Sequence, residues 1–218
     1  MMLKLSFLFT LMLIEAAAAG PWPRQRGQGF AMSSLQVTAA SLSGPENYYF
    51  STYLEYGLTN QLTLGADIGH SVSGETKGIM FLRYPIWLSN QTHHFAAELG
   101  LGTIAGNSVI RPGMSYGRSF EYKESSGWLT VDGLLEHHLG QQISDFKFDI
   151  TYGRTYSNDF KAMVQIQAGK QQGDSSFLRL APSFALPAGK STHVEIGGSV
   201  GLRGASEYGL KVGFWRAF

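Results

Sequence analysis

The sequence predicts an all-β fold: an antiparallel, up-and-down transmembrane β-barrel of about twelve strands. Residues 208–218 alternate between apolar and mixed positions, which is the two-residue period of a β-strand with two different faces. Residues 1–19 have the pattern of a secretory leader. The chain combines 27 glycines and 13% aromatic residues with only 15% charged residues, whereas about 25% are charged in a typical soluble domain. Membrane barrels have this composition because each strand turns only half of its residues toward lipid.

The leader has Lys4 in a positive n-region, an apolar run at residues 5–14, and small residues at Ala17 and Ala19. The apolar run is about half of the roughly 20 residues that a spanning helix needs. We therefore predict a signal peptide that is cleaved near Ala19 rather than an anchor. The chain contains no cysteine, which excludes a lipid-anchored lipoprotein, a disulfide scaffold and thiolate metal sites. Residues 20–28 would then form a short, mobile N-terminal segment in the periplasm.

The rest of the chain, residues 29–218, is predicted to be a single barrel domain. It divides into alternating segments of about ten residues, a length that crosses the apolar band of a membrane when the strand is tilted. An even number of strands places both chain ends on the periplasmic side. Ten and fourteen strands remain alternatives, because boundaries from one sequence are uncertain by about two to four residues. The predicted strands cover residues 30–40, 48–58, 62–70, 78–87, 95–104, 110–120, 127–136, 146–154, 162–170, 177–186, 194–203 and 208–218.

Most ionisable side chains fall on the phase of these segments that is opposite to the large apolar residues. A Lys or Arg facing lipid at the midplane costs about 2–4 kcal/mol, so we place these groups inside the barrel, where acids and bases nearly balance. The predicted lumen-lining acids are Glu55, Asp67, Glu98, Asp132, Glu136, Asp149 and Glu195. The predicted lumen-lining bases are Arg83, Arg111, Lys147, Arg179, Arg203 and Lys211.

A few basic residues fall on the lipid-facing phase, but only near strand ends. Arg118, Arg154 and Arg216 are expected at the periplasmic ends, where a long side chain can reach the headgroups. Lys170 is expected at the outer rim, within reach of lipopolysaccharide phosphates. These positions avoid the costly centre of the bilayer.

Bulky aromatic residues also fall on the inward phase. Barrels of about eight strands are filled by their own side chains, and barrels of sixteen or more leave an open channel. We therefore expect a narrow or partly blocked lumen. The inward aromatic residues are Tyr49, Tyr53, Phe81, Trp87, Trp128, Phe177 and Trp215.

The predicted connections are short on both sides, and no outer loop is long enough to fold inward as a plug. The outer loops centre on Gly44-Pro45 and on residues 71–76, 105–107, 137–144, 171–176 and 204–207. The periplasmic turns at residues 59–61, 157–159 and 187–191 carry Asn, Asp, Gly and Pro, as tight turns require.

The end of the chain resembles the C-terminal signal of bacterial outer-membrane β-barrels, which their assembly machinery recognises. This signal consists of Phe218 together with Phe214, Val212 and Leu210 on the same phase. The hairpin at residues 55–65 is similar to one in small outer-membrane transporter-like families. The resemblance implies an outer-membrane location, contact with outer-membrane lipids and lipopolysaccharide, and the assembly machinery as a partner. It also implies a porin-like, passive conduit for small solutes.

Three other functions stay open: a structural or interaction barrel with a filled lumen, a soluble periplasmic barrel, and an outer-membrane hydrolase. The hydrolase would use a rim histidine, either His70 beside Ser71 and Ser73, or the pair His137-His138. Neighbouring histidines on a strand face opposite sides, so the pair cannot share one site without a bend. For His70, His137 and His138, the simpler explanation is a polar residue at the membrane interface. His93, His94 and His193 are explained most simply as turn residues.

We therefore predict no catalytic residue, no metal ligand and no cofactor. The net charge of +1 also gives the chain no basic field for nucleic acid.

Overall fold

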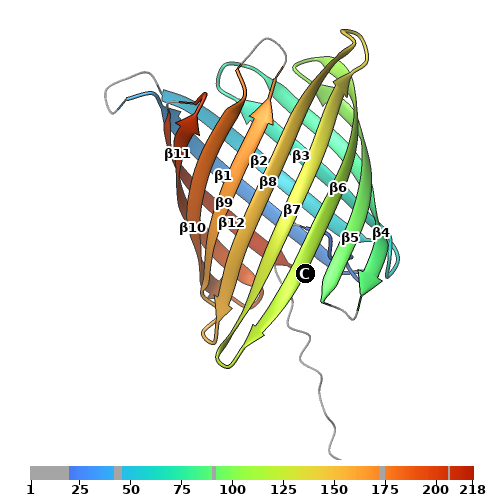
Figure 1. The fold of residues 1–218 in the computed structure, drawn as a ribbon, viewed down its shortest axis with the longest axis vertical. Helices are drawn as coiled ribbons and strands as arrows, with labels where there is room; N and C mark the ends of the chain where they lie inside the picture. The colour runs from blue at the N-terminus through green and yellow to red at the C-terminus, as the bar shows by residue number, and fades with distance from the viewer. Residues whose placement is uncertain (1–19, 42–45, 90–91, 172–174, 206) are drawn as a thin grey trace, which may run out of the picture.

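The computed structural model describes residues 20–41, 46–89, 92–171, 175–205 and 207–218. It confirms the predicted fold class: the chain forms one closed, antiparallel β-barrel of twelve strands (Figure 1). Among the described residues, no helix is long and apolar enough to cross a membrane. The predicted signal peptide and the outer loop centred on Gly44-Pro45 lie outside the described residues.

Each strand pairs with the next one along the chain, and β1 pairs with β12 to close the barrel. Closure gives the backbone groups of every strand a partner, as a membrane-spanning sheet requires. The strands are β1 Gly29–Ala39, β2 Glu46–Gly57, β3 Thr63–Ser71, β4 Thr76–Ser89, β5 His93–Ile104, β6 Asn107–Tyr122, β7 Ser125–His138, β8 Ile143–Tyr156, β9 Lys161–Lys170, β10 Phe177–Gly189, β11 Thr192–Arg203 and β12 Tyr208–Ala217.

The two ends of the barrel differ. The start of β1 and the C-terminus lie at the same end, together with the short turns after β2, β6 and β8 (Figure 1). We call this the terminal end and the opposite one the loop end. The predicted strands lie within these observed strands to within a few residues, but β6, β7 and β8 extend further. His137 and His138 therefore belong to β7. His93 and His94, which were expected in a turn, begin β5.

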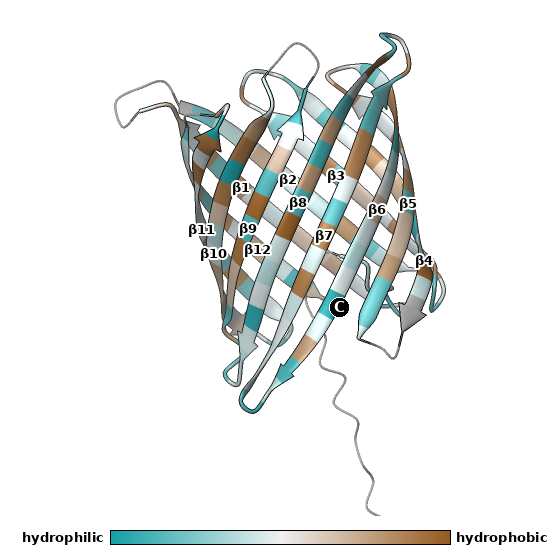
Figure 2. Cartoon of the chain, viewed as in Figure 1, coloured by the Kyte–Doolittle hydropathy of each residue, from teal (hydrophilic) through white to brown (hydrophobic). Residues whose placement is uncertain are grey.

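Side chains alternate between the lumen and the outside along every strand, and the hydropathy of the ribbon alternates with them (Figure 2). On β4, Ile79 and Phe81 are buried with 1% exposure, whereas Met80 between them is 61% exposed. Met114 on β6 and Leu101 on β5 are exposed to a similar extent. A belt of large apolar side chains around the whole molecule is far more than a soluble monomer exposes. It matches the hydrocarbon layer of a membrane.

Aromatic residues gather on the outside near the terminal end. Trp87, Phe95 and Tyr116 pack side by side there, with ring centroids 5.2 Å and 4.7 Å apart. The prediction that Trp87 faces the lumen is wrong, since its side chain is 53% exposed. The pairing of β4 with β5 shifts between Pro85 and Trp87, and the extra residue of such a bulge reverses the phase of the residues after it. Trp87 thus joins an aromatic girdle of the kind that marks a membrane interface.

The outward basic residues lie at strand ends. Arg118, Arg216 and Lys170 are exposed. Arg154 donates a hydrogen bond to Ser125 Oγ at 2.6 Å and lies 4.6 Å above the ring of Tyr122. Each of these cations can therefore reach the headgroup region from its strand.

The lipid-facing assignment predicts a strong dependence on depth for charges introduced on the outside of β6. Met114→Arg places a cation on the exposed face at mid-strand and should destabilise the barrel by about 2–4 kcal/mol. Ser108→Arg places the same side chain on the same face near the loop end and should cost about 0–1 kcal/mol. Urea unfolding from lipid vesicles, followed by tryptophan fluorescence, measures both. Equal effects of the two substitutions would contradict the assignment.

Candidate solute pathway through the barrel

One side of the lumen carries a continuous chain of ion pairs, contributed by β2 to β8. Arg83 binds Glu55 on β2 and donates to Glu98 Oε2 on β5 at 2.8 Å. Arg111 on β6 continues the chain by donating to Glu98 Oε1 at 3.2 Å and to Asp67 Oδ2 at 2.6 Å. Glu98 thus bridges Arg83 on β4 and Arg111 on β6. Arg111 also reaches Asp67 on β3, which does not neighbour β6. We call this side the ion-paired wall.

The ion-paired wall extends toward the loop end through two lysines. Lys77 Nζ lies 2.6 Å from Asp67 Oδ2 and 3.5 Å from Glu136 Oε1. Lys147 Nζ lies 3.0 Å from Glu136 Oε2. Glu136 is almost fully buried, so its charge is balanced by side chains instead of by bulk water.

Phe81 supports two of the arginines of this wall. The guanidinium carbons of Arg83 and Arg111 lie 5.1 Å and 5.5 Å from its ring centroid, within the range of a cation–π interaction. The Phe81 ring also lies where a side chain at Gly65 would stand, because a Cβ there would come within 2.1 Å of it. Glycine at this position of β3 therefore makes room for the ring beneath the arginines.

The other ion pairs of the lumen stand apart from this wall. Lys211 on β12 binds Glu195 on β11 at 2.9 Å, and Trp215 Nε1 donates to the same carboxylate at 2.9 Å. Arg179 binds Glu207 at the loop end. These contacts and the ion-paired wall include every predicted lumen-lining charge except Asp132, Asp149 and Arg203, which form no ion pair within the described part of the chain.

Asp132 and Asp149 face each other directly across β7 and β8. The hydroxyl groups of Ser115 and Thr130 lie beside the Asp132 carboxylate. Arg203 is exposed at the end of β11, where the pairing with β10 shifts register, and so lies at the rim instead of within the lumen. The interior therefore holds a pair of acids without a matching base.

The segment before β1 enters the terminal end of the barrel. Arg83 Nη1 donates to the carbonyl oxygen of Gly20 at 2.9 Å, and Arg24 Nε binds Glu55 Oε2 at 2.7 Å. The ring of Trp22 packs against His94, with centroids 5.7 Å apart. This N-terminal segment was expected to be mobile, but charged groups of the ion-paired wall hold it in place.

Two glycines allow this close approach. A Cβ at Gly117 on β6 would come within 2.5 Å of Pro21 Cγ, and a Cβ at Gly57 on β2 would come within 2.0 Å of the Gln25 carbonyl oxygen. The N-terminal segment therefore lies directly against bare backbone on two strands. It narrows the terminal end of the lumen.

An apolar layer lies in the lumen above this end, on β1, β9, β10 and β12. Phe30, Ala185 and Trp215 are buried together, and Met32 and Met163 pack against them. The rings of Phe30 and Trp215 meet edge to face, with centroids 6.3 Å apart. We call this layer the apolar floor.

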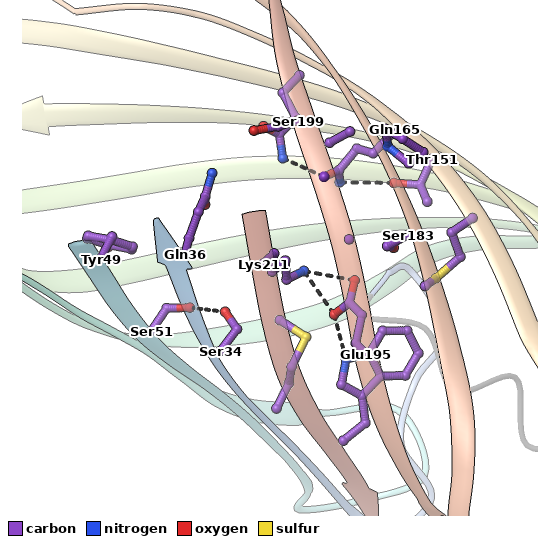
Figure 3. A pocket seen from close by; sticks show the side chains of 18 of the residues that line it. Ser34, Gln36, Tyr49, Ser51, Thr151, Gln165, Ser183, Glu195, Ser199 and Lys211 are labelled. Carbon is purple, nitrogen blue, oxygen red and sulfur yellow. Dashed lines mark hydrogen bonds and ion pairs between the residues drawn. The ribbon is translucent and has the colours of Figure 1, made fainter. Parts of the chain in front are cut away.

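A cavity of about 300 Å³ lies above the apolar floor, on the side of the lumen opposite the ion-paired wall. Most of its lining comes from β1, β2 and β8 to β12 (Figure 3). Nine of its twenty lining residues carry an uncharged hydroxyl or amide group, seven are apolar, and the two charged ones, Glu195 and Lys211, bind each other. We call it the polar cavity. Side chains leave this part of the lumen open.

The sequence missed several contributors to the lumen. Lys77 precedes the predicted start of its strand at residue 78, and Arg24 lies in the segment expected to be mobile. Lys161 on β9 and Asp159 in the preceding turn bind each other at 2.7 Å at the terminal end. The alternation of β4 could have revealed Lys77, because it lies on the same phase as Phe81.

The rim histidines do not assemble a hydrolase site. His70 is exposed on the outside, whereas Ser71 is buried on the lumen face. His137 Nδ1 lies 3.0 Å from Ser144 Oγ, and His138 Nε2 lies 3.2 Å from Asp145 Oδ2. Since successive residues face opposite sides of a strand, the Ser–His pair lies outside the barrel and the His–Asp pair inside. A serine, a histidine and an acid therefore do not line up on one face.

Two further histidines have structural partners at the terminal end. His93 Nδ1 lies 2.9 Å from the Tyr116 hydroxyl, and His193 Nε2 lies 3.0 Å from Asp159 Oδ2. Across the described ranges, no group of three or more His, Asp or Glu is arranged to hold a metal ion.

No protein-family model matches the chain, and no curated protein matches it. Solved structures do. The KdgM porin is 10% identical, with a TM-score of 0.65 over 87% of this chain and 99% of the porin. The COG4313 outer membrane channel from Pseudomonas putida F1 is 11% identical, with a TM-score of 0.59 over 92% and 99% of the two chains. The NanC porin is 11% identical, with a TM-score of 0.56 over 84% and 98%.

The chain has the fold of the bacterial outer-membrane porins. This confirms the predicted resemblance to outer-membrane β-barrels.

The position of Glu55 between Arg24 and Arg83 predicts an effect on stability. Glu55→Gln leaves both guanidinium groups beside a neutral amide in a buried position and should lower the free energy of unfolding by about 3–5 kcal/mol. Glu207→Gln breaks the pair with Arg179 at the more exposed loop end and should cost about 0–1 kcal/mol. Urea unfolding in lipid vesicles compares the two. A smaller loss for Glu55→Gln than for Glu207→Gln would contradict the role given to the ion-paired wall.

Proposed function

We propose that the protein is a narrow, passive, porin-like conduit for small solutes across the bacterial outer membrane. The observation that carries the proposal is the polar cavity, which lies inside a closed barrel whose outside is apolar. A barrel with a purely structural role can fill its lumen with side chains, and an open cavity lined by hydrogen-bonding groups is not required for stability. The likeness to porins supports the proposal through the shared fold.

The two sides of the lumen have different tasks in this proposal. The ion-paired wall fills its side with side chains that hold one another through buried ion pairs, such as Arg111 with Glu98 and Asp67. Such a network is rigid and leaves little space. Solutes would therefore pass along the opposite side, through the polar cavity lined by β1, β2 and β8 to β12.

The charges of the lumen argue against a preference for polyanions. KdgM has been solved in complex with disordered oligogalacturonate, which is a chain of acidic sugars. In the present chain, the arginines and lysines of the ion-paired wall are neutralised by acids. Asp132 and Asp149 add negative charge without a base. A polyanion would therefore meet no unpaired cation among the arginines and lysines of the ion-paired wall.

Export and assembly complete the proposal. A signal peptide at residues 1–19 would be removed, and the assembly machinery would recognise the end of β12. Leu210, Val212 and Phe214 are exposed on the outside of this strand. Phe218 exchanges backbone hydrogen bonds with Gly29, at 2.7 Å and 3.0 Å, where β1 and β12 meet. The proposed signal thus lies at the seam that closes the barrel.

Single-channel recording in a planar bilayer tests the proposal. We expect discrete, small current steps in KCl for the protein that starts at Gly20. Trp22→Ala removes a ring from the terminal end of the lumen and should raise the unitary conductance. Trp87→Ala removes a ring from the outside and should leave it unchanged.

A correctly folded, inserted protein that stays silent would reject the conduit and favour a structural or interaction barrel. Insertion is checked by heat-modifiable migration on a detergent gel. Equal conductance of wild type and Trp22→Ala would contradict the constriction by the N-terminal segment.

A further inference from the structure

We propose that the polar cavity binds small, uncharged, polyhydroxylated solutes, namely neutral mono- and disaccharides, during their passage. This inference rests on the proposed function and names the substrate class of that same pathway. It follows from the charge, the hydrogen-bonding groups and the shape of the polar cavity.

The first argument concerns charge. Glu195 and Lys211 are the two lining side chains that are charged at neutral pH, and their charged groups lie 2.9 Å apart and neutralise each other. Trp215 Nε1 also donates a hydrogen bond to the Glu195 carboxylate. A charged solute would leave water for a lining that offers no free countercharge, which is costly. An uncharged solute avoids this cost.

The second argument concerns hydrogen bonds. Hydroxyl and amide groups from several strands point into the cavity (Figure 3). Gln165 donates to Thr151 Oγ1 at 3.0 Å, and Gln167 donates to Gln165 Oε1 at 2.6 Å. Within the described part of the chain, Gln36 makes no side-chain hydrogen bond, so its amide is available to a solute. A purely apolar solute would leave the Gln36 amide unpaired, whereas a polyol can both donate to and accept from the hydroxyl and amide groups of the lining.

The third argument concerns the bottom of the cavity. Phe30 and Trp215 line it at the apolar floor, and Trp128 adds a third aromatic ring to the lining from β7. A sugar ring has an apolar face of C–H groups and a rim of hydroxyls, so it can rest on aromatic side chains while its rim binds polar ones. The volume of about 300 Å³ is at the small end of ligand pockets, which range over about 300–1,000 Å³. It suits a solute of one or two sugar rings.

Three sugars with the same ring test this proposal: glucose, glucuronate and glucosamine. Each is added to single channels of the protein that starts at Gly20, and the interruption of the KCl current is titrated. We expect glucose to interrupt the current at lower concentrations than either charged sugar.

A lining variant locates the site. Gln165→Leu should weaken the interruption by glucose roughly two- to tenfold, the equivalent of about one hydrogen bond, when the current is normalised to the open-channel KCl conductance of the same variant. Gln141→Leu, an exposed change outside the lining, should have no effect on either quantity.

The outcomes separate this inference from the proposed function. Channels that conduct KCl but respond equally to all three sugars, or best to a charged one, overturn the sugar site and leave the conduit intact. Preference for glucose that is unchanged in Gln165→Leu places the binding elsewhere and overturns this assignment of the cavity. A silent protein overturns both.

Discussion

Charged side chains on membrane-crossing strands must be balanced inside the barrel, and this constraint organises the rest of the structure. The outside of the strands faces hydrocarbon, where a cation costs about 2–4 kcal/mol at the midplane. Turning the side chain inward avoids that cost but buries the charge against its neighbours. Arg111 is only 1% exposed, and its buried charge is balanced because it binds both Glu98 and Asp67.

The same constraint explains why the lumen is asymmetric. An ion pair requires both partners to approach closely, so the balanced charges of β2 to β8 draw together and fill their side of the barrel. On the strands that complete the circle, β1 and β9 to β12, half of the residues that line the cavity are Ser, Gln or Gly. These short or neutral side chains leave the polar cavity open. The position of the cavity is therefore a consequence of where the charges are paired.

The sequence predicted the architecture well because a barrel strand is a local pattern. Alternation alone indicated which face of each strand carries the charges, and residues such as Glu55 and Arg83 lie on the lumen face. Trp87 shows where the pattern fails: a bulge after Pro85 reverses the phase, and nothing in the alternation marks it. Arg203 lies on the inward phase but too close to the rim to enter the lumen.

The candidate pathway was much less predictable than the fold. A strand pattern gives the face of a residue but not the partner it meets across the lumen, so the chain from Glu98 through Arg111 to Asp67 could not be derived. The seating of the N-terminal segment depends on bare backbone at Gly57 and Gly117, which are far from it in sequence. Both features require the closed barrel, because closure brings distant strands face to face.

The central claim is that solutes pass along the polar cavity and not along the ion-paired wall. Since the chain has no cysteine, single cysteines report on each side separately. Ser51 lines the cavity, and Ser115 is buried beside Asp132 on the other side. A small thiol-reactive cation applied to single channels should reduce the conductance of Ser51→Cys and leave that of Ser115→Cys unchanged. The reverse pattern, or an equal reduction in both, would contradict this account.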